Sequence, residues 1–150
     1  MRNFFAAAAL ILMALPGRAG ENIVMVGANR NVAATMDALV AAVTGAGATV
    51  FARVDHAGGA ASVGMELADA ELLIFGNPKL GTPAMQDNVL AGLYLPLKVL
   101  VYEGADGRTW LAYEDPDAML GRLEGTPEGA DYIEKMTGAL GKLTTKAAGG

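Results

Sequence analysis

Two loops of the sequence hold the residues that could do chemistry. His56, the only histidine, directly follows a strand-like segment and stands beside glycines that leave room around its imidazole. An imidazole in such a place can be a general base, a metal ligand or a satisfied polar group. The second loop follows the next apolar segment and contains Asn77, Lys79, Thr82 and Met85. If the two loops meet at neighbouring strand ends, these side chains form one ligand-binding site.

The second loop has features of an anion-binding turn. Backbone N–H groups that precede a helix, the Asn77 amide and the Lys79 ammonium can converge on a negative charge. The loop lacks the Gly-Lys-Ser/Thr ending of a nucleotide-binding loop, so nucleoside triphosphates are not implied. The alternative is a rigid turn in which Lys79 pairs with an acid such as Asp55. A small anionic ligand is the partner that the first interpretation predicts.

Three classes of function stay open for these residues. In the first, the chain is a binding or interaction module without catalytic residues. In the second, His56 is the general base of a small enzyme in which Lys79 and Asn77 stabilise developing negative charge. In the third, His56 holds copper or haem iron together with the thioether of Met65 or Met85. The sequence names no cofactor.

The N-terminal residues have the composition of a secretory signal peptide. Arg2 supplies a positive start, Phe4 to Leu15 is an unbroken apolar run of 12 residues, and Gly17-Arg18-Ala19 offers small residues for cleavage. A transmembrane anchor needs about 20 apolar residues, and this run is shorter. We expect residues 1–19 to be removed after Ala19, which leaves a periplasmic or secreted protein with no membrane span.

Residues 20–150 have the length and composition of a single acidic domain. The removed segment contains two arginines and no acid, so the net charge changes from −5 to −7. Because such a surface repels phosphate backbones, nucleic acid is not an expected partner. The chain has no cysteine, which excludes disulfides and thiolate chemistry. Its stability must therefore come from a packed apolar core.

Apolar patterns along the chain predict the elements that position these loops. Strand-type runs occupy 23–27, 49–55, 72–75, 97–103 and 109–114, and the Asp106-Gly107 reversal joins the last two in a hairpin. Helical spacing begins at Asn31 and ends near Gly45, and a second helical stripe begins at Thr126-Pro127-Glu128. Short helices are expected within 79–94 and after Asp115-Pro116. The order favours an α+β fold of strand, helix, four strands and helix, with a mainly antiparallel sheet and the helices packed on one face.

Some local expectations are more specific. Val50, Ala52 and Val54 should share one face of their strand. The run 72–75 has no polar alternation, as expected of a central strand that is covered on both faces. Residues 56–62 should be a flexible loop, and 144–150 a frayed tail. Trp110 and Tyr113 should lie on opposite faces of one strand.

Several segments of the chain resemble one family. They are Asp55-His56-Ala57-Gly58-Gly59-Ala60, the stretch Leu72-Leu73-Ile74-Phe75-Gly76-Asn77-Pro78-Lys79-Leu80-Gly81-Thr82-Pro83, and Trp110-Leu111-Ala112-Tyr113 with Asp115-Pro116. The chain resembles the domain of unknown function 302 family. That resemblance implies a fold similar to one repeat of the TATA-box-binding protein and a homodimer, and it brings no established activity. DNA binding is not carried over, since folds host unrelated activities and this chain is acidic.

Overall fold

The computed structural model describes residue 20 and residues 22–150 of the chain. The predicted signal peptide lies outside the described residues. The strands are β1 (Ile23–Ala28), β2 (Thr49–Asp55), β3 (Ala70–Gly76), β4 (Leu97–Glu103) and β5 (Thr109–Glu114). The helices are α1 (Val32–Gly45), α2 (His56–Ser62), α3 (Pro78–Asp87), the 3₁₀ helix η1 (Val89–Leu93), α4 (Pro116–Leu120) and α5 (Asp131–Ala148). This order confirms the predicted α+β fold of strand, helix, four strands and helix.

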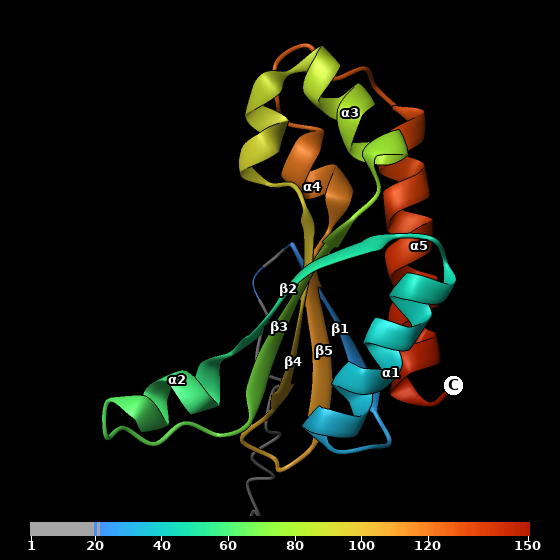
Figure 1. Cartoon of the computed structure of the whole chain (residues 1–150). Coiled ribbons are helices and arrows are strands. Elements are labelled where there is room, and N and C mark those ends of the chain that lie inside the picture. Colours follow the sequence, from blue (N-terminus) through green and yellow to red (C-terminus); the bar gives the residue numbers. More distant parts are fainter. Residues whose placement is uncertain (1–19, 21) are drawn as a thin grey trace, which may run out of the picture.

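The strands form one antiparallel sheet in the order β1-β5-β4-β3-β2. The first two strands of the chain therefore lie at opposite edges, and α1 crosses the sheet between them. Figure 1 shows α1 and α5 side by side against one face of the sheet. The short elements α3, η1 and α4 gather at one end of the sheet, and α2 lies beyond the other. Within the described residues, the sheet thus has one helix-covered face and one face without a helical layer.

The core lies between the sheet and the two long helices. Val99 and Val101 of β4 alternate with side chains on the opposite face, and both are fully buried. Met36 and Leu39 of α1 and Leu140 of α5 meet them from the helical side. Alternation in the strands and 3.6-residue spacing in the helices therefore bring the apolar side chains into one layer.

Polar caps fix where several of these elements begin. The Asn31 side chain accepts a hydrogen bond from Ala34 N at 2.9 Å, which starts α1 at the predicted place. Asp115 caps α4 in the same way, with Pro116 in the first turn. Gly107 at the tip of the β4–β5 hairpin has a φ of 71°, which glycine adopts without strain. The residues that cap these two helices and form this turn could therefore be identified from the sequence.

The helical segments depart from the sequence expectations at three places. The expected flexible loop at 56–62 is the helix α2, because Asp55 accepts from Gly58 N at 2.7 Å and caps it. The expected frayed tail is wrong, since α5 continues to Ala148, where the carbonyl accepts from Asn29 N at 3.0 Å. Helix α5 begins at Asp131 rather than at Thr126.

The strands depart from the expectations at two places. The run 72–75 is not a central strand covered on both faces, because β4 is the middle strand and Leu72 is only half-buried. A register shift between Val50 and Ala52 breaks the expected alternation of β2. Val50 therefore packs against the core, whereas Ala52 lies on the other face of the sheet.

Candidate functional site

A cavity of about 290 Å³ lies beside α3, and three of the predicted site residues line it. Asn77, Thr82 and Met85 contribute from α3 and its N-cap. We call this cavity the α3 pocket. Its other walls come from the β2 bulge, the loop before β4 and helix α5. Segments that are far apart in the sequence therefore build one recess.

The start of α3 places Asn77 at the rim of the α3 pocket. Strand β3 ends at Gly76, and Pro78 cannot donate to a neighbouring strand, so the ladder stops there. The Asn77 Oδ1 atom accepts a hydrogen bond from Lys79 N at 3.0 Å and caps the new helix. Its side-chain nitrogen is a hydrogen-bond donor, and the Thr82 hydroxyl can donate or accept. These two side chains give the pocket its polar groups.

The walls of the α3 pocket are otherwise apolar. Larger apolar side chains form them, among them Phe51, Leu80, Met85, Leu95, Pro96, Leu97 and Met136. Lys79 is exposed in the first turn of α3 and is not among the lining residues. The predicted anionic ligand therefore meets no ammonium group in the lining. A recess of this composition fits a mainly apolar ligand that has one polar group.

The far end of α3 is tied to α5. The Tyr132 hydroxyl donates a hydrogen bond to Asp87 Oδ2 at 2.9 Å, and the Tyr132 side chain is buried. Burial raises the pKa of Tyr132, and the nearby Asp87 carboxylate raises it further. The phenol therefore stays protonated and holds α3 against the helix that supplies Met136 to the pocket.

His56 does not join the other predicted site residues. Strands β2 and β3 run antiparallel, with Thr49 opposite Gly76 and Asp55 opposite Glu71. His56 follows one end of this ladder and Asn77 the other, so about six residue steps, or roughly 20 Å of strand, separate them. The expected convergence of His56 with Lys79 is therefore wrong. An enzyme that combines His56 with Asn77 and Lys79 in one site is excluded by the same register.

The proposed metal site pairs His56 with either Met65 or Met85, and the structure excludes the pairing with Met85. Met85 lies on α3 and cannot reach His56 for the reason given above. Met65 lies three residues after α2, the helix that begins at His56, and it is 66% exposed. Within residues 20 and 22–150, no three His, Asp or Glu side chains gather in the arrangement of a metal site.

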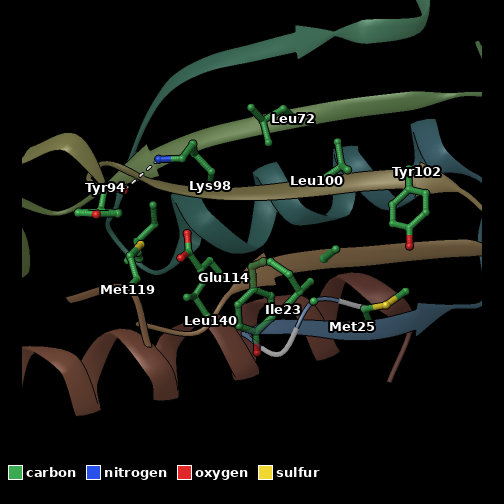
Figure 2. Close-up of a pocket in the computed structure, with 14 residues that line it drawn as sticks. Ile23, Met25, Leu72, Tyr94, Lys98, Leu100, Tyr102, Glu114, Met119 and Leu140 are labelled. Atoms are coloured by element: carbon green, nitrogen blue, oxygen red, sulfur yellow. Dashed lines mark hydrogen bonds between the residues drawn. The ribbon is translucent and has the colours of Figure 1, made fainter. Parts of the chain in front are cut away.

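A second and larger hollow, of about 630 Å³, opens on the sheet face that none of the described helices covers, and Met119 of α4 and Leu140 of α5 also line it. Figure 2 shows Met25 of β1, Leu72 of β3, and Leu100 and Tyr102 of β4 standing on this face. The register aligns an apolar row across all five strands: Met25, Ala112, Leu100, Leu72 and Val54. We call the surface around this row the open sheet face. It is a wide apolar surface rather than a catalytic cleft.

Charged groups stand at both ends of the open sheet face: Lys98 and Glu114 at one end, and Arg108, over the Trp110 ring, at the other. The Lys98 ammonium donates to the carbonyl of Tyr94 at 2.9 Å, as the dashed line in Figure 2 marks. Glu114 lies 3.7 Å from Arg122. At the other end Trp110, which pairs with Gly27, is half-buried, whereas Tyr113 is buried among the core residues. The expected separation of the two aromatic side chains is confirmed.

Sequence reasoning missed most of the α3 pocket. Phe51 reaches it from the β2 bulge, Pro96 from a cis peptide bond and Met136 from α5. Each of these residues looks like an ordinary core or strand residue in the sequence. The open sheet face was also missed, although the absence of polar alternation in 72–75 was a signal for it. That run is apolar on both faces, although a helical layer covers only one.

No helix among the described residues combines the length and the apolar character that crossing a bilayer requires. Nevertheless, the chain is 39% identical over 130 residues to two proteins named fluoride-specific ion channel FluC 1, from Brucella suis biovar 1 and Brucella abortus biovar 1. The matched region is 86% of this chain and 51% and 48% of those proteins. The chain thus spans about half the length of these curated relatives.

The fold is also found in a solved structure. An uncharacterised conserved DUF302 protein from Bacillus stearothermophilus superposes with a TM-score of 0.75 at 18% sequence identity. The match covers 85% of this chain and 99% of the other. At this identity the likeness concerns the fold. The model of the family described as domain of unknown function DUF302 matches residues 24–143, and the chain therefore belongs to that family.

Proposed function

We propose that the chain is an exported binding module that forms a homodimer, and that the α3 pocket of each copy takes a small and mainly apolar ligand. The observation that supports this function is that Asn77, Thr82 and Met85 line one cavity. Cavities of roughly 300 to 1,000 Å³ hold drug-sized ligands, and the α3 pocket is at the lower end of that range. The ligand is therefore small.

The chemistry of the walls indicates what such a ligand carries. An apolar body gains about 25 cal/mol for each Å² that it buries. A single polar group at one end would accept from the Asn77 amide and bond the Thr82 hydroxyl. A charged ligand fits less well, since burying an unpaired charge among apolar side chains is costly. The proposed ligand class is thus an uncharged molecule with one hydrogen-bonding group.

The substitution Gly81→Leu tests this site with the neutral dye N-phenyl-1-naphthylamine. Gly81 lines the α3 pocket, and a Cβ atom there would lie 3.7 Å from Leu95 Cδ1, so the added side chain fits and fills the cavity. Leucine also favours the helix over glycine by about 0.8 kcal/mol, so the fold is retained. We expect saturable dye fluorescence with the native chain and at least about tenfold weaker binding with the variant.

Gly138→Leu is the matched control, because Gly138 is an exposed helical glycine whose added Cβ would meet nothing within 4 Å. Its dye affinity should equal that of the native chain. Leu100→Lys, on the open sheet face, should also leave it unchanged. Dye binding that is lost in Leu100→Lys and kept in Gly81→Leu would show that the α3 pocket is not the site.

Export rests on the composition of residues 1–19. The positive start, the apolar run of 12 residues and the small residues at 17 and 19 support cleavage after Ala19. We expect the protein purified from the periplasm or the medium to have the intact mass of a chain that starts at Gly20. A full-length chain in the cytoplasm would contradict export.

A second candidate function is a role beside a fluoride channel. It is supported by the 39% identity to proteins that carry that name and that are about twice as long as this chain. Two domains joined in one chain meet at high effective concentration, so they need only weak mutual affinity to act together. Cells that lack this chain should then grow less well in fluoride than cells that have it. Equal growth at every fluoride concentration would remove this candidate.

A further inference from the structure

The open sheet face carries more apolar surface than a solvated sheet face normally has. Antiparallel sheets with one face in water show polar side chains on that face. Here the row of Met25, Ala112, Leu100, Leu72 and Val54 crosses the sheet without a polar side chain. Met25 and Val54 are each 37% exposed. A contiguous apolar surface of this kind marks an interaction site.

The charges of the open sheet face suit a second copy of the same chain. Lys98 and Glu114 line the hollow, and at the other end of the face Arg108 lies over the Trp110 ring, whose Nε1 atom donates to Asp106. These two cations and two anions leave the face neutral, whereas the whole chain carries a formal charge of −5. Two acidic copies repel each other across most surfaces, but this face can be buried without like-charge contact.

Helix α2 and the residues after it form a projecting arm, which we define as residues 56–67. Helix α2 has no buried residue, and Figure 1 shows it extending away from α1 and α5. Three apolar side chains stand out from the segment that follows it: Val63 is 70% exposed, Met65 66% and Leu67 54%. Within the described chain, this arm exposes its apolar side chains to solvent. It is placed to contact a molecule that lies on the open sheet face.

The area of the open sheet face indicates that the face and the arm together form the interface. Five strands spaced about 4.8 Å apart and six residues long give a face of roughly 24 by 20 Å, or about 480 Å². A standard stable interface buries about 800 Å² on each partner. The sheet face alone falls short of that value, and an apolar arm from the partner adds the contact that is missing. Two copies related by a twofold axis would each give one arm and one face.

We propose that a second copy of this chain covers the open sheet face, and that the arm of each copy packs against the other. The inference rests on the homodimer of the proposed function and specifies its surface. Met25 and Met65 are buried in the dimer, whereas Met85 stays at the α3 pocket. Because Met85 is 38% exposed and Met25 37% in the single chain, the two sulfur atoms are matched reporters.

Oxidation of methionines by hydroxyl radicals tests the surface on the native chain. Labelling is compared at about 1 µM and about 200 µM protein, which lie below and above a dissociation constant of about 10 µM. We expect Met25 and Met65 to react at least about fivefold more slowly at the higher concentration, and Met85 to react equally at both. A dimer by sedimentation in which Met25 stays reactive would overturn the proposed surface and leave the homodimer standing. A chain that stays monomeric at both concentrations would overturn both.

The substitution Leu100→Lys gives an independent test, because it puts a charge in the middle of the apolar row. We expect sedimentation equilibrium to show a monomer, with a far-UV circular dichroism spectrum like that of the native chain. The matched control is Leu93→Lys on η1, which is 77% exposed and lies off the sheet, and it should stay dimeric. Leu100→Lys that still dimerises like the native chain would overturn the proposed surface. Dye binding at the α3 pocket is a separate readout, so its loss in a protein that still dimerises counts only against the ligand site.

Discussion

Leu73→Ala should lower the free energy of unfolding by about 3 to 4 kcal/mol, and Leu72→Ala by less than about 1.5 kcal/mol. The two leucines are neighbours in β3 and point to opposite faces of the sheet. Leu73 is fully buried against the helical layer, whereas Leu72 lies half-buried in the hollow of the open sheet face. Removing the Leu73 side chain leaves a cavity in the closed core, and such a cavity adds to the lost transfer free energy.

Urea unfolding at low protein concentration measures this difference on the single chain, because dilution removes any contribution of a partner. At high concentration the cost of Leu72→Ala should rise, since a dimer that covers the open sheet face buries that side chain. Equal costs for the two substitutions at low concentration would contradict the one-sided core. The two substitutions therefore test the one-sided core. The dependence of the cost of Leu72→Ala on protein concentration also tests whether a second copy covers the open sheet face.

Tyr132→Phe should lower the free energy of unfolding by about 1.5 to 3 kcal/mol at neutral pH, which is the range for a hydrogen bond to a charged group. The substitution removes the hydroxyl that donates to Asp87 Oδ2 at 2.9 Å and keeps the buried ring. It leaves the Asp87 carboxylate without this donor at the end of α3. We therefore also expect weaker dye binding at the α3 pocket, since α3 supplies much of its lining.

The cost of Tyr132→Phe should depend on pH. Burial and the Asp87 carboxylate raise the pKa of Tyr132 in the folded chain above its ordinary value of 10.0. A group whose pKa is raised by folding contributes fully below its unfolded pKa, and the contribution is lost as the pH rises through the folded pKa. Denaturation at pH 7 and at about pH 11 should thus show the native chain losing more stability than the variant.

Tyr102→Phe is the control for this pair of measurements. Tyr102 stands half-buried on the open sheet face, where loss of a hydroxyl should change the free energy of unfolding by less than about 0.5 kcal/mol. If the free energy of unfolding differs between the native chain and Tyr132→Phe by the same amount at both pH values, ionisation of the Tyr132 phenol does not reduce its contribution to stability.

The candidate site could be predicted only in part. The sequence predicts that Asn77, Thr82 and Met85 share a site, and they do line one cavity because a single helix and its N-cap carry them. The prediction that His56 joins them assumes that both loops end neighbouring strands on the same side. That assumption is wrong because β2 and β3 are antiparallel, so the residues that follow them leave the sheet at opposite ends.

The sequence by itself determined the five strands and the two long helices, but neither helix α2 nor the ends of α5. Apolar periodicity located the strands and the long helices, and short-range capping by Asn31 and Asp115 fixed two helix starts, because these interactions span only a few residues. Only the tertiary structure decided which strand lies in the middle, which face of the sheet stays open and which side chains meet in the α3 pocket. Those outcomes depend on strand pairing and on a bulge between Val50 and Ala52, and contacts between residues distant in sequence leave no periodic signal in the chain.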